Sequence, residues 1–442
     1  MTDDQQVRAL LTRAADLADD IQPPVARLVG SARRRRRFRA AGSVIAVVAV
    51  AGGLFALPPA LRTLFLRHVT AVGDHAGRGL TAAQLARFRW LALASSPLGA
   101  RTDPVLAWTG RELIELGGTK QGVTQNDGAV FDSATGRWAL IAHVKGNVGF
   151  SNAVNVWTGR QLFVTNGQAA SCPGGAPVTR CLPRAGLYDP ATNRWTTTLL
   201  PKQLGGLTLA GAAWTGRDVV LAGTSFAHPR LAVAAYTPAT GRWRMITPRL
   251  PRHPPPSSAA IVAAQSRVLL WSLWARDIAK KDGGTIRSGV DVYSLAPSGR
   301  WRDITGSWPQ ARSVDGPVSA GGKILIPPAQ IWCGACPHPF GESPAKLADP
   351  RTLALTTIPE SPLGTRPPIQ PPIWLLTDSA VVAGTTAPNG RLTQLAAYDP
   401  QSRRWYVLPS PPARPALAAD PLPAGNRLFV LTQSGALLSL QK

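Results

Sequence analysis

The sequence is poor in charge, in lysine and in the short motifs of common enzymes. Only 16% of its 442 residues are charged and 45% are hydrophobic, a balance that excludes a chain that stays unfolded and solvated. Eight of the 48 basic residues are Lys, so the net charge of +24 comes almost entirely from Arg, as expected from a GC-rich genome. No basic stripe interleaved with aromatic residues stands out, and we therefore expect no nucleic-acid partner.

Catalytic and metal-binding signatures are missing as well. No G-x-S-x-G, Walker or zinc-protease motif occurs, and the six His include no close pair. We therefore predict no catalytic residues, no metal site and no cofactor. A lyase or hydrolase whose residues are dispersed over several loops stays the alternative, because spacing along the sequence cannot reveal such a site.

One long uncharged run lies near the N-terminus. Residues 40–61 contain 22 uncharged residues rich in Val, Ala and Leu, which as a helix would span about 33 Å and cross a bilayer core of about 30 Å. The basic run 33–37 and Arg39 precede it directly. Because basic flanks stay in the cytoplasm, the sequence predicts a single-pass transmembrane helix with its N-terminus cytoplasmic and the rest of the chain extracytoplasmic.

Two other interpretations of this run stay open. A cleaved secretory signal would have a shorter basic start and a small-residue cleavage site, whereas Pro58 and Pro59 end this run. Arg35–Phe38 also matches the core of a twin-arginine signal, which any run of arginines before Phe would do. A buried soluble helix is the remaining alternative, since Gly52 and Gly53 weaken the segment.

The rest of the chain is rich in turn residues and contains an internal repeat. Gly (42) and Pro (41) together favour many short strands over long helices. One repeated pattern starts with an aromatic residue and ends in Arg-Trp, with Asp-Pro or a related pair and Thr-Gly or a related pair between. Its four clear copies are Phe131–Trp138, Tyr188–Trp195, Tyr236–Trp243 and Tyr398–Trp405.

A second pattern, Trp-Thr-Gly-Arg, begins at Trp108, Trp157 and Trp214, and an apolar run follows each copy. Together the two patterns predict a four-stranded unit with two tight hairpins. In the longer pattern the Asp side chain caps the turn, Pro presets the backbone, and Gly or Asn takes the left-handed position. The recurring Trp is expected to pack between neighbouring units.

In these two motifs the chain resembles the kelch-type β-propellers, including bacterial ones related to the central domain of galactose oxidase. The resemblance covers residues 85–442, although the double Gly of the family survives only as Gly117-Gly118. It implies an all-β propeller and raises a copper radical site. Such a site needs free Tyr, Cys and His ligands, and four of the five Tyr occupy the repeat position, so we expect no oxidase.

The number of units follows from the outer-strand positions. Ser96 and Ser361 begin two copies of Ser-Pro-Leu-Gly-x-Arg, each six residues after an outer-strand position. The outer-strand positions are then residues 90, 138, 195, 243, 301, 355 and 405. Seven positions near the kelch period of about 50 residues predict seven blades. Because the strand near Trp90 has no preceding partners, one blade is expected to contain both chain ends.

The sequence thus divides into four predicted parts. Residues 1–39 form a basic cytoplasmic tail with a short amphipathic helix, 40–61 the transmembrane helix, 62–84 a juxtamembrane linker, and 85–442 the seven-bladed propeller. The propeller is expected to act outside the cytoplasm as a binding or scaffolding module for an unknown envelope protein or glycan.

The candidate binding residues lie on long connections between second and third strands, at about 166–184, 272–289 and 327–346. Variable loops on a rigid scaffold are where binding usually resides, although these could equally be solvated insertions. The candidates are Trp274, Arg276, Asp277, Trp332, His338 and Phe340.

The four Cys fall in the same connections as two local pairs, Cys172 with Cys181 and Cys333 with Cys336. Outside the cytoplasm, paired Cys in loops most simply form disulfides. The second pair resembles a thioredoxin active site, but Pro337 follows in a loop rather than in a helix. Redox exchange and a metal site with His338 are the weaker alternatives.

Overall fold

The computed structural model describes only part of the chain. It covers residues 80–442 except 145–148, 152, 167–183, 226–229, 251–255, 257, 266, 279–284, 297, 308–316, 332–339, 364–372 and 388. These residues belong to one compact unit, Thr63–Lys442. The predicted tail, the transmembrane segment and nearly all of the linker lie outside them. Within the described part, no helix is both long enough and apolar enough to span a bilayer.

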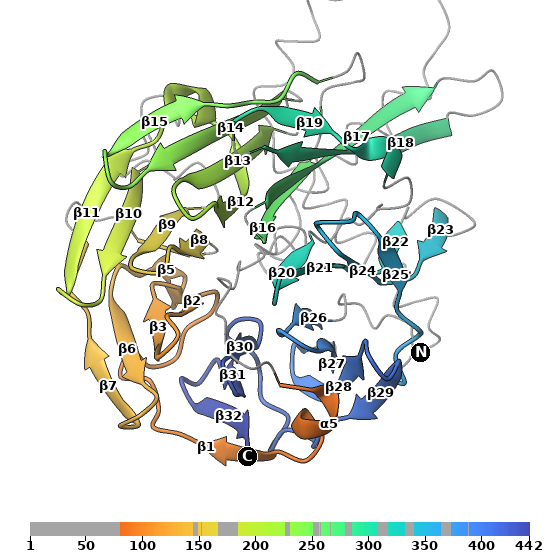
Figure 1. The fold of residues 1–442 in the computed structure, drawn as a ribbon. Coiled ribbons are helices and arrows are strands. Elements are labelled where there is room, and N and C mark those ends of the chain that lie inside the picture. The colour runs from red at the N-terminus through yellow and green to blue at the C-terminus, as the bar shows by residue number, and fades with distance from the viewer. Residues whose placement is uncertain are drawn as a thin grey trace, which may run out of the picture. The chain divides into compact units, whose positions relative to one another are not determined.

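The described residues form an all-β propeller of seven four-stranded antiparallel sheets arranged in a ring (Figure 1). From the innermost strand outward, blade 1 holds β2 (Val105–Trp108), β3 (Glu112–Leu116), β6 (Gly128–Asp132) and β7 (Arg137–Leu140). Blade 2 holds β8 (Ala153–Trp157), β9 (Leu162–Asn166), β10 (Arg184–Asp189) and β11 (Arg194–Leu199). Blade 3 holds β12 (Thr208–Trp214), β13 (Val219–Ser225), β14 (Arg230–Thr237) and β15 (Arg242–Met245).

The remaining blades repeat this order. Blade 4 holds β16 (Ser258–Ala264), β17 (Arg267–Ile278), β18 (Thr285–Leu295) and β19 (Trp301–Asp303). Blade 5 holds β20 (Val318–Ala320), β21 (Lys323–Ile326), β24 (Lys346–Ala348) and β25 (Leu355–Thr357). Blade 6 holds β26 (Ile373–Leu376), β27 (Val381–Thr386), β28 (Leu392–Asp399) and β29 (Arg404–Val407). Blade 7 holds β30 (Leu422–Ala424), β31 (Arg427–Leu431), β32 (Leu437–Gln441) and β1 (Arg89–Ala92).

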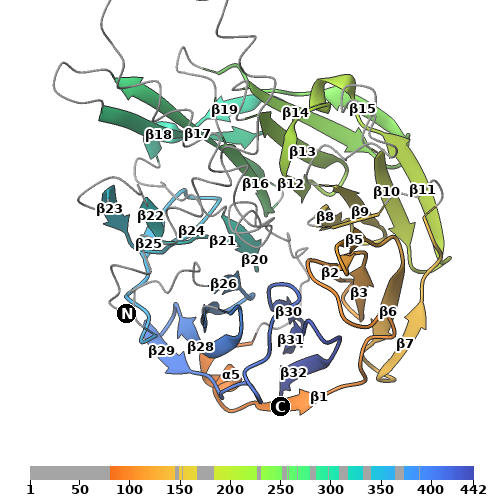
Figure 2. The same cartoon turned by 180° about the vertical axis from the view of Figure 1, so that it is seen from behind.

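The all-β fold and the seven blades predicted from the sequence are therefore confirmed. Each predicted outer-strand position, including Leu355, lies in the outermost strand of its blade. In blade 7 the strand β1 pairs with β32 in a register that runs from Arg89 opposite Gln441 to Ala92 opposite Leu438. Figure 2 shows the two strands side by side where the ring closes. This pairing leaves no blade without its outer strand.

Short helical elements lie before or between blades, and two small hairpins lie within blades. Helix α5 (Ala82–Leu85) precedes β1, with Thr81 and Gln84 forming a capping box at its start. Two 3-10 turns, η4 (Lys202–Leu204) and η5 (Thr305–Ser307), follow outer strands. Two small hairpins, β4 (Thr119–Lys120) with β5 (Val123–Thr124) and β22 (Ala329–Ile331) with β23 (Phe340–Ser343), lie between second and third strands.

Side-chain hydrogen bonds explain why the two sequence motifs form tight turns. In the longer motif the Asp132 Oδ1 accepts the backbone N–H groups of Ala134 and Thr135, and Gly136 takes a φ of 69°. In the shorter motif the Thr109 hydroxyl accepts the N–H of Glu112 at 2.9 Å. Thr377 makes the same contact with Ala380 although its motif has lost the Gly. The turns are thus specified locally, as Asx and Thr turns.

The core is divided among the seven interfaces between neighbouring blades. Each interface holds its own cluster of buried side chains, such as Leu113, Phe131 and Phe429 between blades 7 and 1. The cluster between blades 6 and 7 also contains Leu80 and Leu85, from α5 and its flank. Where the structure describes their side chains, the middle strands are consequently mostly buried on both faces, which accounts for the high apolar content of a chain made mostly of short strands.

In six of the seven blades the outer-strand Trp joins the blade to the one before it. Its indole N–H donates to the chain just after, or at the end of, the preceding blade's outer strand. The six donor and acceptor pairs are Trp90 with Pro409 O, Trp138 with Ala94 O, Trp195 with Ala142 O, Trp243 with Thr198 Oγ1, Trp301 with Ile246 O and Trp405 with Pro359 O. Blade 5 has Leu355 at this position and so lacks an indole donor. The predicted role of the repeated Trp in packing between units is confirmed.

We predict that Trp195→Phe lowers the free energy of unfolding by about 1 to 2 kcal/mol beyond the loss of ring volume, because it leaves the Ala142 carbonyl without its donor. Trp374→Phe is the matched control, since the Trp374 indole N–H has no hydrogen-bond partner among the described residues. Denaturant titration of both variants measures the difference. Equal losses in the two variants would contradict the proposed bridging role.

Candidate binding surface at the loop rim

The two ends of the propeller differ in their connections. Because every blade is an antiparallel meander, its first–second and third–fourth turns lie at one end of the ring, which we call the turn rim. The second–third connections lie at the opposite end, the loop rim. In blades 3, 6 and 7 these connections are short. Blades 1, 4 and 5 carry additional β structure there, and residues 167–183 of blade 2 lie outside the described residues.

The connection of blade 4 differs from the prediction. Residues 272–289 were expected to form a long irregular loop, but most of them continue β17 and β18 as a paired ribbon that ends at Ile278 opposite Thr285. The inner neighbour β16 pairs only as far as Leu273, and the outer neighbour β19 only with 293–295. The ribbon therefore extends past both neighbouring strands, and it projects from the ring in Figure 1.

Trp274 lies at the base of this ribbon and is half-buried. A Cβ on Gly289, the residue opposite, would come within 2.4 Å of the Trp274 ring, so the indole lies directly over the Gly289 backbone. The Trp274 indole N–H also donates to the buried Asp291 Oδ1 at 3.4 Å. These contacts give Trp274 a structural part in the hairpin. Arg276 and Asp277 follow in β17, opposite Arg287 and Ile286.

The connection of blade 5 contains the small hairpin β22–β23. Phe340 begins β23 and pairs with Ile331. Trp332, His338, Cys333 and Cys336 lie outside the described residues, as do Cys172 and Cys181 in blade 2. The structure therefore brings the backbones of Trp274, Arg276, Asp277 and Phe340 to the loop rim of two adjacent blades, and the predicted disulfides stay predictions.

A third projection, the β4–β5 hairpin of blade 1, is fastened by a residue that the sequence analysis did not single out. The buried Arg101 donates to the Gly117 carbonyl at 2.6 Å and to Asp127 Oδ1 at 2.9 Å, and these residues flank the hairpin on its two sides. Arg101 also donates to the Leu98 carbonyl at 2.7 Å. The one available signal was that Arg ends both copies of Ser-Pro-Leu-Gly-x-Arg.

The charges around Arg101 are unevenly paired. Burial would raise the pKa of Asp127, but the hydrogen bonds and charge of Arg101 outweigh it and hold that pKa below its ordinary value. Glu115 is fully buried 3.7 Å from the Arg101 guanidinium. There burial dominates, and it raises the pKa of Glu115 although Ser96 and Arg101 oppose the shift. This cluster lies between blades 7 and 1 and ties the blade containing both chain ends to the loop rim.

Four of the five tyrosines are core residues. Tyr188, Tyr236, Tyr293 and Tyr398 are all buried, and three of them pack against a Trp, as in Tyr236 with Trp243 at 4.8 Å between ring centroids. Burial raises the pKa of Tyr188 to about 12. Across the described ranges no three His, Cys, Asp or Glu side chains come together as a metal site would require.

Lys346 is the buried base closest in sequence to a loop-rim projection. It begins β24 directly after the β22–β23 connection, and burial lowers its pKa.

Comparison with known proteins adds no family to these observations, because no family model and no curated protein matches the chain.

We predict that Glu115→Gln stabilises the propeller at neutral pH. A raised pKa means that the unfolded chain loses the Glu115 proton first, so ionisation costs the folded protein stability as pH rises above the ordinary value near 4.5. The variant lacks this cost, which is of the order of 1 to 3 kcal/mol for a poorly compensated buried group. Thermal melts from pH 4 to pH 8 should show the variant's advantage growing with pH. An advantage that shrinks with pH would contradict the assignment.

Proposed function

We propose that the chain is a membrane-anchored, kelch-type propeller whose loop rim binds an envelope protein or glycan outside the cytoplasm. The observation that carries the proposal is that adjacent blades 4 and 5 each add a β-hairpin at the loop rim, where blades 3, 6 and 7 have short connections. Two neighbouring projections on a closed scaffold form one surface. Rigid scaffolds with extended connections at one end are the usual basis of recognition.

The kelch type is supported by the turns of both repeat motifs and by the Trp contacts between blades. The membrane anchor is supported by the uncharged run 40–61 behind its basic flank. Two disulfides would brace the connections that contain the Cys pairs. Within this proposal Arg276, Asp277, Trp332, His338 and Phe340 contact the partner, while Trp274 holds the base of the hairpin.

We predict that removing the blade 4 projection abolishes partner capture without loss of fold. Trp274 and Gly289 are opposite one another, so replacing residues 275–288 with Asn-Gly would close the hairpin with a two-residue turn and keep the register of the blade. Capture by the full chain from detergent-solubilised envelope should fall to background, because the replacement removes Arg276 and Arg287 and Arg is enriched among the residues that dominate binding energy. The melting temperature should change little.

The matched control replaces Arg137, Arg194 and Arg242 by Ala. These exposed arginines lie in turn-rim hairpins, and the control should leave capture intact. A second variant, Trp332→Ala with Phe340→Ala, tests blade 5 separately. Capture that survives both loop-rim variants would mean that the projections are solvated insertions, and the binding proposal would be wrong.

The membrane topology has its own test. The last strand β32 ends at Gln441 and Lys442 is exposed, so a reporter can follow Lys442 without entering the sheet. We predict that alkaline phosphatase fused there is active, because that enzyme folds only outside the cytoplasm, and that green fluorescent protein at the same site is dark. The reverse result would contradict the orientation while leaving the fold unaffected.

A further inference from the structure

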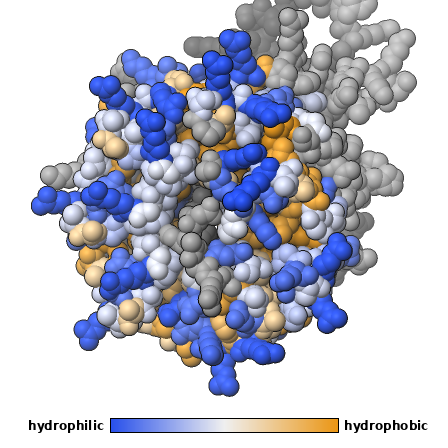
Figure 3. All heavy atoms as spheres, viewed as in Figure 1, coloured by the Kyte–Doolittle hydropathy of each residue, from blue (hydrophilic) through white to orange (hydrophobic). Residues whose placement is uncertain are grey.

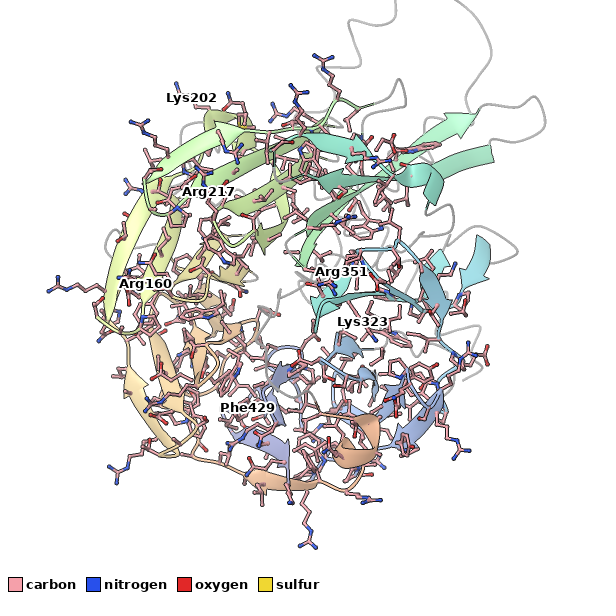
Figure 4. The ribbon with its side chains drawn as sticks, in the orientation of Figure 1. Arg160, Lys202, Arg217, Lys323, Arg351 and Phe429 are labelled. Carbon is pink, nitrogen blue, oxygen red and sulfur yellow. The ribbon has the colours of Figure 1, made fainter. Side chains whose placement is uncertain are left out.

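The turn rim carries basic residues from every blade. Blades 1 to 5 contribute one from each of their two turns, and blades 6 and 7 contribute from one turn. In blade order they are Arg111 and Arg137, Arg160 and Arg194, Arg217 and Arg242, Arg267 and Arg300, Lys323 and Arg351, Arg403 with Arg404, and Arg427. The positions repeat because the turn motifs end in Arg, and Figure 4 labels Arg160, Arg217, Lys323 and Arg351 around the ring.

The acidic residues of the same turns are drawn inward. Asp132, Asp189 and Asp399 accept backbone N–H groups within their turns, where they act as caps. The side chain of Asp189 is 8% exposed, whereas Arg160, which pairs with it, is 80% exposed. The same contrast holds for Asp132 at 21% and Arg111 at 71%. The outward side of the turn rim is therefore predominantly positive.

Several of these arginines are not neutralised by a carboxylate. In the described part of the chain Arg137, Arg194 and Arg242 are exposed and form no ion pair. A guanidinium presents a planar set of donors that matches phosphate oxygens in pairs. Figure 3 shows hydrophilic side chains spread around one face of the ring rather than gathered in one spot. Because the basic turn positions recur in every blade, they suit an extended anionic surface better than a single small anion.

The polypeptide also enters the propeller at the turn rim. The Leu80 carbonyl lies 3.5 Å from the hydroxyl of Thr377, and Thr377 forms the first turn of blade 6. Helix α5 follows at once and packs against the same blade. Leu80, the first residue that the structure describes, therefore lies at the turn rim.

From these observations we propose that the turn rim binds the phosphate headgroups of an anionic lipid bilayer, leaving the loop rim turned toward its partner. The inference rests on the membrane anchor proposed above for its physiological setting. The groups that would contact the lipid phosphates are the basic side chains of the turn rim. Each basic residue near an anionic membrane contributes a factor of about five to binding, and salt screens the attraction.

The test uses the full chain reconstituted in vesicles of phosphatidylcholine alone or with about 30% phosphatidylglycerol, which supplies the anionic headgroups. Peptide-resolved hydrogen exchange is measured over the turn-rim and loop-rim segments. We expect at least about tenfold slower exchange at the turns near Arg137, Arg194 and Arg242 in the anionic vesicles only. The protection should disappear in 1 M NaCl, because the Debye length falls to about 3 Å and salt screens the attraction.

The test variant replaces Arg137, Arg194 and Arg242 by Gln and should lose most of the protection. The control replaces Arg184, Lys202 and Arg230 by Gln, which removes the same charge from exposed positions at the loop rim. This control should keep the protection of the turn rim. Flotation in 1 M NaCl tests the anchor separately, because an inserted helix is insensitive to salt. Protection that is independent of lipid charge, or lost equally in both variants, would overturn the proposal even if the anchor and the loop-rim capture hold.

Discussion

Pairing of β1 with β32 is the constraint on which the whole propeller depends. A ring of separate sheets has no covalent reason to stay closed, and here the outer strand of blade 7 comes from residues about 350 positions away from its partner. The pairing converts seven stacked sheets into a closed ring. Arg101 reinforces it from the side of blade 1, through bonds to Leu98, Gly117 and Asp127.

Closure also allows the two rims to diverge. The turn rim is set by the repeat, since each turn must satisfy the same backbone groups with the same side chains. The loop rim is free of that requirement, because the interfaces between blades are already filled by their own apolar clusters and tied by Trp indoles. Hairpins can then lengthen in blades 4 and 5 without disturbing the ring. A uniform basic rim and a variable rim are thus both consequences of one scaffold.

The fold was predictable from the sequence because the turns carry local information. Asp132, Gly136 and Trp138 each make in the structure the contact that the motif indicates. Even Leu355, which has lost the aromatic residue, could be assigned from the neighbouring Ser361. Local hydrogen bonding of this kind repeats with the period of the chain and so identifies the blades.

The candidate site was less predictable, because its features arise from pairing over long distances. The mostly apolar run 268–275 is long enough to continue β17, and Asp282-Gly283-Gly284 is a turn signal, so the hairpin could have been found. For Trp274, a candidate binding residue, only the strand register shows that Gly289 lies opposite and accommodates the ring. The Arg101 cluster joins residues from three separate segments, and no spacing rule predicts such a meeting.

Deletion of residues 85–96 tests the closed ring most directly, when compared with removal of residues 276–287, an equal length from the blade 4 projection. The first deletion removes β1 and the segment that leads to Arg101, whereas the second shortens a ribbon that extends past its neighbours. Loss of cooperative unfolding in the first variant, with a nearly unchanged melting temperature in the second, is the result that closure by β1 predicts. Equal melting temperatures for the two variants would contradict it.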